Sequence, residues 1–190
     1  MPFILASSSP RRLSLLKQIH VTPDEIIPAD INEDPIEGEL PRPHALRLAS
    51  EKCQKIIESR PEAIILAADT VVGVGRRILP KAETIEQAQY CLELLSGRSH
   101  RVFTGIAVYS PTKGLQSKVV ETRLKVKSLS QHDYDYYLQS REWEGKAGGY
   151  GIQGYAESFI QSLSGSYSNV VGLPVRETHH MLREHGVAHS

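Results

Sequence analysis

The chain has 190 residues, of which 40% are hydrophobic and 23% charged, an ordinary balance for a folded globular protein. Its 22 basic and 22 acidic residues give a formal net charge of zero, whereas proteins that grip nucleic acid are usually basic. We therefore expect no nucleic-acid partner, and any bound anion should be small and held locally. No apolar run approaches the length of a membrane span, so no membrane partner is expected either.

The two cysteines, Cys53 and Cys91, lie in stretches with apolar periodicity. They are expected to be buried and to pack as small hydrophobic side chains. Their spacing resembles neither a disulfide framework nor a zinc site. The N-terminus has no basic region before its short apolar run, which is not typical of a signal peptide. Together these features predict a reducing, cytoplasmic location.

The N-terminal third predicts a short buried strand at 3–5 and then a helix at 10–19. Ser9 is the expected N-cap of that helix, since serine is favoured there and the next residue is a proline. Residues 24–43 hold four prolines and several acidic residues, which predicts the end of a strand and then a loop. A helix is expected at 43–59 because apolar residues recur on one face.

The middle of the chain predicts three long strands. Residues 63–74 form a continuous apolar run with β-branched ends, which favours a buried strand. A helix at 84–97 follows and is stopped by Gly97. Two further strands, 101–109 and 117–127, are joined by a short turn, and the second alternates apolar and polar residues as a half-solvated strand does.

The C-terminal part predicts a short helix at 130–140, a loop at 144–155, a strand running into a Ser/Gly turn over 158–171, and a final helix at 173–186. Strands and helices interleave along the whole chain, while hairpin-like pairs also occur. The fold class expected from this order is mixed α/β with a largely central sheet flanked by helices.

The octamer LASSSPRR, residues 5–12, places a strand end and three serines directly before a helix start that carries Arg11 and Arg12. Helix N-termini already carry partial positive charge, so two cations there are unfavourable unless an anion binds. Backbone N–H groups, the Ser7 hydroxyl and an arginine fork together suit phosphate. The alternative is a plain helix cap with solvated arginines.

Asp69 is an acid inside an apolar run, and burying a charge is costly unless it is paired or bound to a cation. It is interpreted either as a base or metal-binding carboxylate, or as a strand-end cap of a nearby loop. Glu33 in the acidic loop offers a second carboxylate. Hard divalent cations such as magnesium use few carboxylates and leave room for substrate phosphates.

Three lysines, Lys52, Lys81 and Lys146, read individually as solvated surface charges. Residues 149–154 match G-x-G-x-x-G, but no buried strand precedes them, so a dinucleotide site is not expected. The glycines more simply let backbone approach a ligand. Tyr150 would then stack on a nucleobase, and the Gln153 amide would hydrogen-bond its edge.

Taken together, these segments resemble the Maf-type nucleoside triphosphate pyrophosphatases. The resemblance runs in order from residue 4 to about residue 182, and it rests on Glu33 and on the pieces LASSSPRR, RLASEK, AADTVV, LPKAETIEQA, LSGRSHRVFTG, KAGGYGIQG and GSYSNVVGLP. It implies the Maf and inosine-triphosphatase-like fold, with a central mixed sheet and two lobes around a cleft. It also implies a single Maf-like domain over 1–190 and a homodimer.

The chemistry implied by the resemblance is hydrolysis of a nucleoside triphosphate to the monophosphate and pyrophosphate with a divalent cation, Mg or Mn. Asp69 matches the family's catalytic proton acceptor and Glu33 its partner carboxylate, and both are the expected metal ligands. The phosphate-contacting positions are matched by Ser7, Arg11, Arg12, Lys52 and Lys81, with Lys146 and Tyr150 as further candidate substrate contacts.

The tripeptide ADT and the GIQG segment resemble the branch that acts on dTTP and UTP. Arg11, Thr70 and Gln153 match the positions that mark this branch, whereas the 7-methyl-GTP branch typically carries Ser-Asp-Gln at the acid. A glutamine amide both donates and accepts, which suits the imide edge of uracil or thymine. Two departures stand out: Ala82 replaces the usual proline, which is expected to loosen the Lys81 segment, and Asn32 replaces a common acid.

Two alternatives remain beside this assignment. One is a nucleotide-binding regulator of septum formation that does not turn over its ligand. The other is a house-cleaning enzyme for modified nucleotides, including 7-methyl-GTP. The presence of Asp69 among cationic side chains favours an enzyme that hydrolyses its ligand over a regulator that only binds it.

Overall fold

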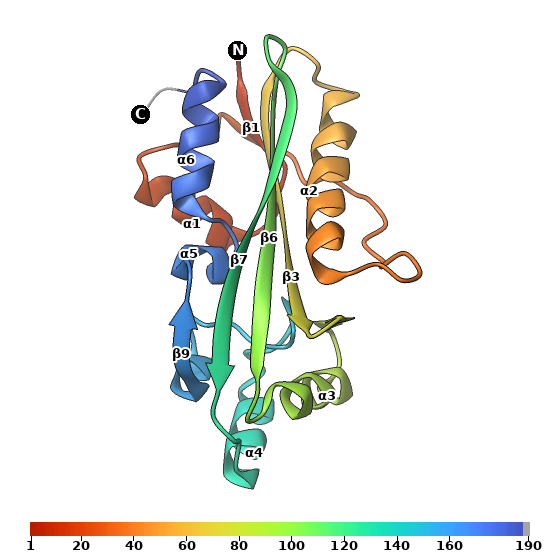
Figure 1. Ribbon diagram of the computed structural model, residues 1–190. Coiled ribbons are helices and arrows are strands. Elements are labelled where there is room, and N and C mark those ends of the chain that lie inside the picture. The colour runs from red at the N-terminus through yellow and green to blue at the C-terminus, as the bar shows by residue number, and fades with distance from the viewer. Residues whose placement is uncertain (188–190) are drawn as a thin grey trace.

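The computed structural model describes residues 1–187. Within them a mixed, seven-stranded sheet runs through the centre of the molecule in the order β2-β1-β3-β6-β7-β9 (Figure 1). β1 is parallel to β2 and β3, and the other pairs are antiparallel. Its strands are β1 (Phe3–Leu5), β2 (Glu25–Ile26), β3 (Ile64–Val74), β4 (Arg77–Ile78, paired to β3), β6 (Ser99–Ser110), β7 (Gly114–Val126) and β9 (Ile160–Ser164).

Helices cover both faces of this sheet. In Figure 1, α2 lies on one side, α1, α5 and α6 lie on the other, and α3 and α4 lie at the lower end. The mixed α/β architecture with a central, helix-flanked sheet is therefore confirmed. The remaining elements are α1 (Pro10–Gln18), α2 (Pro41–Ile57), β5 (Lys81–Ala82), α3 (Ile85–Leu95), α4 (Gln131–Ser140), β8 (Lys146–Ala147), η1 (Tyr155–Phe159), α5 (Tyr167–Val171) and α6 (Val175–Glu184).

The alternation of side chains along β3 divides the core into two layers. Ile65 and Ala67 pack with Ala49 and Cys53 of α2, whereas Leu66 packs in the larger cluster on the opposite face. Successive strand residues point to opposite faces, so this register places Asp69 on the α2 side and Thr70 on the side of α1 and α5. The expected burial of both cysteines is confirmed, and burial raises the pKa of the Cys53 thiol to about 12.

Gly105 of β6 lets α2 lie unusually close to the sheet. A Cβ atom at this position would stand 2.1 Å from the carbonyl oxygen of Ala45 and 3.1 Å from the Cβ of Ala49. Gly105 is the direct neighbour of Asp69 in the β3–β6 register. The glycine therefore brings α2, which carries Lys52, against the strand that carries Asp69.

Several predicted elements need correction. The strand predicted in residues 158–171 is present as β9 and ends at a turn at Gly165 as expected, but η1 precedes it and the helix α5, which was not predicted, closes the segment. Helix α5 forms because the Ser166 hydroxyl accepts from Asn169 N at 3.2 Å. The prediction that Ser9 is the N-cap residue of α1 is confirmed, although its side chain makes no capping hydrogen bond. The loop at 144–155 contains the short strand β8.

Ala82, which stands where the family usually has proline, lies in a paired segment, and the expected loosening of that segment stays a prediction. Ala82 is fully buried, pairs opposite Lys146 in the β5–β8 ladder, and its carbonyl accepts from Gly145 N at 2.8 Å. Lys81 is part of the same ladder.

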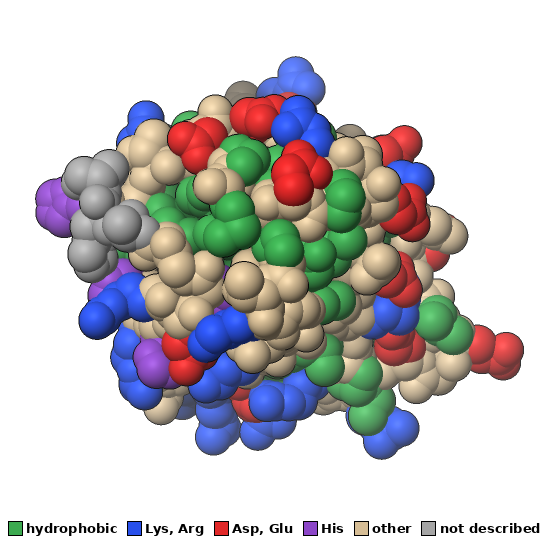
Figure 2. Space-filling model, turned by 90° about the horizontal axis from the view of Figure 1, so that it is seen from above, with side chains coloured by type: hydrophobic (Ala, Val, Ile, Leu, Met, Phe, Trp, Pro, Cys, Tyr) green, Lys and Arg blue, Asp and Glu red, His purple; other side chains and the backbone are tan. Residues whose placement is uncertain are grey.

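The face seen in Figure 2 carries basic and acidic side chains. Seen from above, hydrophobic side chains are exposed at the centre of the end face, with basic and acidic side chains around them (Figure 2). None of the helices in residues 1–187 is long and apolar enough to cross a bilayer.

Candidate active site

The candidate site is a cavity of about 570 Å³ at the carboxyl end of β1. β1 pairs with β3 only as far as Leu66, and the chain then turns away into α1. The edge of β3 at Asp69 and Thr70 is thereby left open to the cavity. Segments 28–33 and 142–154 contribute the other walls, so the cavity corresponds to the expected cleft, and its volume suits a small-molecule ligand.

The cavity carries a net positive charge, although the formal net charge of the whole chain is zero. Five cationic side chains and three carboxylates line it, which leaves an excess of two positive charges. A local cationic pocket on a neutral protein favours a small polyanion over a nucleic acid. The cations are Arg11, Arg12, Lys52, Lys81 and Lys146, and the carboxylates are Glu33, Asp69 and Glu142.

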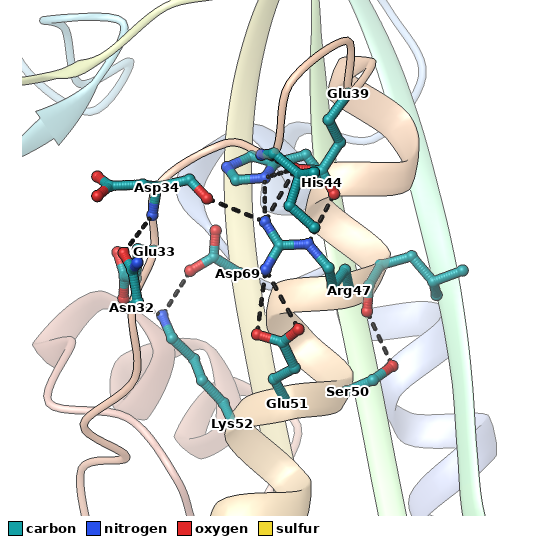
Figure 3. Close-up of polar contacts among 12 residues, drawn as sticks. Asn32, Glu33, Asp34, Glu39, His44, Arg47, Ser50, Glu51, Lys52 and Asp69 are labelled. Atoms are coloured by element: carbon teal, nitrogen blue, oxygen red, sulfur yellow. Dashed lines mark hydrogen bonds and ion pairs between the residues drawn. The ribbon is translucent and has the colours of Figure 1, made fainter.

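Lys52 joins the two predicted catalytic carboxylates. Its Nζ atom lies 2.5 Å from Asp69 Oδ1 and 2.5 Å from Glu33 Oε1. Lys81 pairs with the other oxygen of Glu33. Figure 3 shows Lys52 reaching from α2 to Asp69 on β3. Asp69 is 3% exposed and Lys52 only 7%, so Lys52 is not the solvated surface charge that its sequence position predicts.

These contacts also set the charge of Glu33. Partial burial opposes its ionisation, but the hydrogen bonds from Lys52 and Lys81 outweigh burial and lower the pKa of Glu33 to about 2. Glu33 is therefore ionised at neutral pH. In the described residues, Asp69 bonds to Lys52 and to no loop N–H group, which removes the interpretation of Asp69 as a loop cap.

Arg12 ties α1 to β3 and α5 on the opposite face of the sheet. It donates from Nη1 to Ser7 Oγ at 3.1 Å, from Nη2 to Thr70 Oγ1 at 3.2 Å, and from Nε to the Gly172 carbonyl at 2.8 Å. Burial lowers the pKa of Arg12, while the charge of Asp69 opposes that shift. Arg11 also lines the cavity, so the structure brings both arginines to it.

Thr70 has no spare proton for a ligand. Thr104 Oγ1 donates to the Asn169 carbonyl at 2.9 Å, so its single proton is used. Thr70 Oγ1, 2.9 Å from Thr104 Oγ1, must then be the donor of that pair while it accepts from Arg12. Thr70 therefore acts on the cavity chiefly by fixing Arg12.

The glycine-rich segment supplies the other wall. Lys146 donates to the Glu142 carbonyl, and burial together with the charge of Arg11 lowers the pKa of Lys146. The Tyr150 hydroxyl lies 2.5 Å from His100 Nε2 and its side chain is buried, whereas Gln153 is exposed within the cavity wall. Stacking of Tyr150 on a nucleobase stays a prediction.

Three residues near the site were not predicted from the sequence. Thr104 fixes Thr70, Glu142 lines the cavity, and His100 contacts the Tyr150 hydroxyl. Arg47 was not predicted either, because its spacing to Glu51 indicates an i, i+4 ion pair but gives no sign of its contact with Glu39. These residues are connected across the fold rather than along the chain, so no local pattern indicates them.

The donor set at Asp69 and Glu33 fits a hard divalent cation that shares its ligands with a substrate. Magnesium typically uses one or two carboxylates together with oxygens of a substrate phosphate. In residues 1–187 no group of three or more His, Cys, Asp or Glu side chains is placed to hold a metal. A metal at this position would therefore depend on oxygens from the substrate or from water.

Comparisons with known proteins show the family of this chain and its fold. A family model described as Maf-like protein matches residues 2–185. A dTTP/UTP pyrophosphatase of Caulobacter vibrioides is 55% identical over 94% of this chain and 93% of its own length. One of Maricaulis maris is 58% identical over 94% and 86%, respectively. A solved HAM1 protein from Coxiella burnetii shares the fold with a TM-score of 0.55 at 16% identity, over 96% of this chain and 98% of that one.

Proposed function

This chain belongs to the Maf family, and from that premise we propose that it hydrolyses dTTP and UTP to the nucleoside monophosphate and pyrophosphate. The observation that carries the proposal is the Asp69–Lys52–Glu33–Lys81 group, in which Asp69 and Lys52 are buried, inside a cavity with excess positive charge. Relatives at 55% and 58% identity bear the name dTTP/UTP pyrophosphatase, which supports the same substrates here.

The triphosphate would lie against the cationic wall. Its charge is spread over many oxygens, so catalysis consists largely of positioning and of cationic stabilisation. The first turn of α1 receives no cap from the Ser9 side chain, which leaves its N–H groups for phosphate. Arg11, Lys52 and Lys81 would add charge, and Arg12 would hold Ser7 and Thr70 beside it.

Asp69 would accept the proton of the attacking water. Asp69 is the most deeply buried carboxylate of the cavity, in a setting where an ionic contact counts for more than in bulk solvent. Lys52 keeps its carboxylate fixed, and on substrate binding Lys52 can turn from the carboxylates toward phosphate. Glu33 stays ionised and would anchor Lys81 at the far side.

A divalent cation, Mg or Mn, is part of the proposal, with Asp69 and Glu33 as its protein ligands. When bound, it would supply Lewis-acid stabilisation of phosphate charge and lower the pKa of a coordinated water. The residues of this chain would then orient that water and hold the triphosphate in line.

Specificity is assigned to Arg11, Thr70 and Gln153. Gln153 is exposed in the cavity wall, where its amide is available to the imide edge of a pyrimidine. Modified triphosphates, including 7-methyl-GTP, are the competing substrates, and a regulator of cell division without turnover is the competing function. The retained Asp69 with its lysine partners favours turnover.

The test is a panel of canonical and modified nucleoside triphosphates with magnesium or manganese, followed by chromatography of the products. The proposal predicts monophosphate and pyrophosphate, with dTTP and UTP hydrolysed fastest. Diphosphate and orthophosphate would contradict cleavage between the α- and β-phosphates. Binding without turnover would support the regulator.

We further propose a cytoplasmic location, which the two buried, free cysteines support. The resemblance to Maf proteins supports a homodimer, and light scattering coupled to size exclusion tests it. A monomer at micromolar concentration would contradict that assembly.

A further inference from the structure

A charged cluster outside the cavity connects α2 to the loop that carries Glu33. Its members are Glu39, His44, Arg47 and Glu51, none of which lines the cavity. Figure 3 shows the Arg47 guanidinium at the centre of this cluster, between the loop and the helix. The proposed mechanism gives it no role.

Arg47 uses its whole fork there. Its Nε and Nη2 atoms donate to the two oxygens of Glu39 at 2.7 and 2.8 Å, and Nη1 lies 3.1 Å from Glu51. Such bidentate pairs are strong and geometrically specific. The Glu39 side chain is only 9% exposed, and His44 Nδ1 lies 2.7 Å from it, so the pair is shielded from solvent.

The same guanidinium reaches the backbone next to Glu33. Arg47 Nη2 donates to the carbonyl of Asp34 at 3.1 Å. A turn closes around Glu33, because the Asn32 side chain accepts from Asp34 N at 2.9 Å. Glu39 also accepts from Ile36 N at 3.0 Å, so both ends of segment 34–39 are tied to one ion pair. Hydrogen bonding by Arg47 lowers the pKa of Glu39 to about 2, so the pair persists at ordinary pH.

We propose that Arg47 is a positioning residue: it docks segment 32–39 on α2 and so presents the Glu33 carboxylate to Lys52 and Lys81. The inference rests on the proposed function, because it assigns Arg47 an effect on that reaction through Glu33. Lys52 stands five residues after Arg47 on the same helix, so one rigid element carries both the residue that docks the segment and one of the two lysine partners of the Glu33 carboxylate.

The test variant is Arg47→Met, which keeps an unbranched stem and removes every donor. The matched control is Arg60→Met. Arg60 makes an equally bidentate pair with Glu25, at 2.8 and 2.6 Å, but that pair lies at β2 and is not part of the cluster. Arg47→Met should lower kcat/KM for dTTP by about ten- to one hundred-fold, as expected when a reacting group is misplaced, and Arg60→Met by less than about two-fold.

A double-mutant cycle separates positioning from general damage. In a Glu33→Gln background, Arg47→Met should lower the residual rate by less than about two-fold, because the residue through which it acts is already impaired. An equal loss in both backgrounds would overturn the inference. So would full activity of a folded Arg47→Met protein.

Hydrogen exchange supplies a readout that does not depend on turnover. Amides of residues 32–39 should exchange at least about ten-fold faster in Arg47→Met than in the wild type, whereas Arg60→Met should leave them unchanged. Unchanged exchange in Arg47→Met would refute the docking role.

If Arg47→Met does not fold, Glu39→Gln removes the charge of the same pair and takes its place in both measurements. If the wild type hydrolyses neither dTTP nor UTP, the proposed function fails, and exchange alone then decides whether Arg47 holds the segment.

Discussion

Gly105→Ala tests the claim that close approach of α2 to the sheet builds the site. The added Cβ would stand 2.1 Å from the Ala45 carbonyl oxygen, whereas ordinary contact begins at 3.4 Å. Helix α2 must therefore withdraw by about 1.3 Å, the difference between these two distances. The surrounding atoms have no free space to move into, because Ala45, Ala49 and Ala107 are fully buried. Overpacking of this kind lowers the free energy of unfolding by about 1–3 kcal/mol. The replacement of glycine by alanine also reduces the conformational entropy of the unfolded chain, which offsets up to about 1 kcal/mol of this loss.

We expect a net loss of about 2 kcal/mol and a fall in Tm of about 4–8 °C for a chain of this size. The rate of the folded protein should fall as well, because withdrawal of α2 also moves Lys52 away from Asp69. A displacement of about 1 Å can lower the rate by about one hundred-fold. The assays are thermal unfolding and pyrophosphate release below Tm. Gly151→Ala is the stability control, because its Cβ meets only the flexible end of Lys146, at 2.8 Å from Cε. A Gly105→Ala protein with wild-type Tm and rate would refute the reasoning.

Two further predictions concern the nucleobase-binding pocket and the free energy of unfolding at acidic pH. Gln153→Leu removes both hydrogen-bonding groups at similar volume, so the preference for UTP and dTTP over CTP should shrink while turnover survives; unchanged selectivity would remove Gln153 from the pocket. The pKa of Glu39 falls from 4.5 to about 2 on folding, so its ion pair stabilises the protein above about pH 4.5 and the contribution is lost as pH falls through about 2. Glu39→Gln should therefore be less stable than the wild type by on the order of 2–3 kcal/mol at pH 7 and by little near pH 2, as measured by urea unfolding. A difference that does not change with pH would contradict this assignment.

Local sequence patterns predict most of the fold because they report burial and periodicity. The apolar run around Asp69 has the length and composition of a central strand, and Gly97 ends its helix as expected. In segment 158–171 the strand and the turn at Gly165, with a φ of +132°, are predicted, but the five-residue helix α5 is not. That helix depends on the Ser166 cap, and it is too short to show a helical periodicity.

The site is predicted only in part for a related reason. Asp69 is conspicuous as an acid among apolar residues, but Lys52 looks like any helix-surface lysine until the helix is packed on β3. Likewise Arg47 and Glu39 meet only because the loop folds back on α2. Composition and spacing give no sign of charges that are paired across the fold. The resemblance to a family supplies candidate catalytic residues but not the residues proposed to position them.

The most direct test of the central claim is Asp69→Asn, which keeps shape and hydrogen-bonding capacity and removes the negative charge. Asp133→Asn is the matched control, because Asp133 also pairs with a lysine, Lys127 at 3.1 Å, but does so at the start of α4. If Asp69 is the base, turnover of dTTP should fall by about two to four orders of magnitude, with affinity by calorimetry retained or tightened and Asp133→Asn near the wild-type rate. A folded Asp69→Asn protein that releases pyrophosphate at near the wild-type rate would contradict the account.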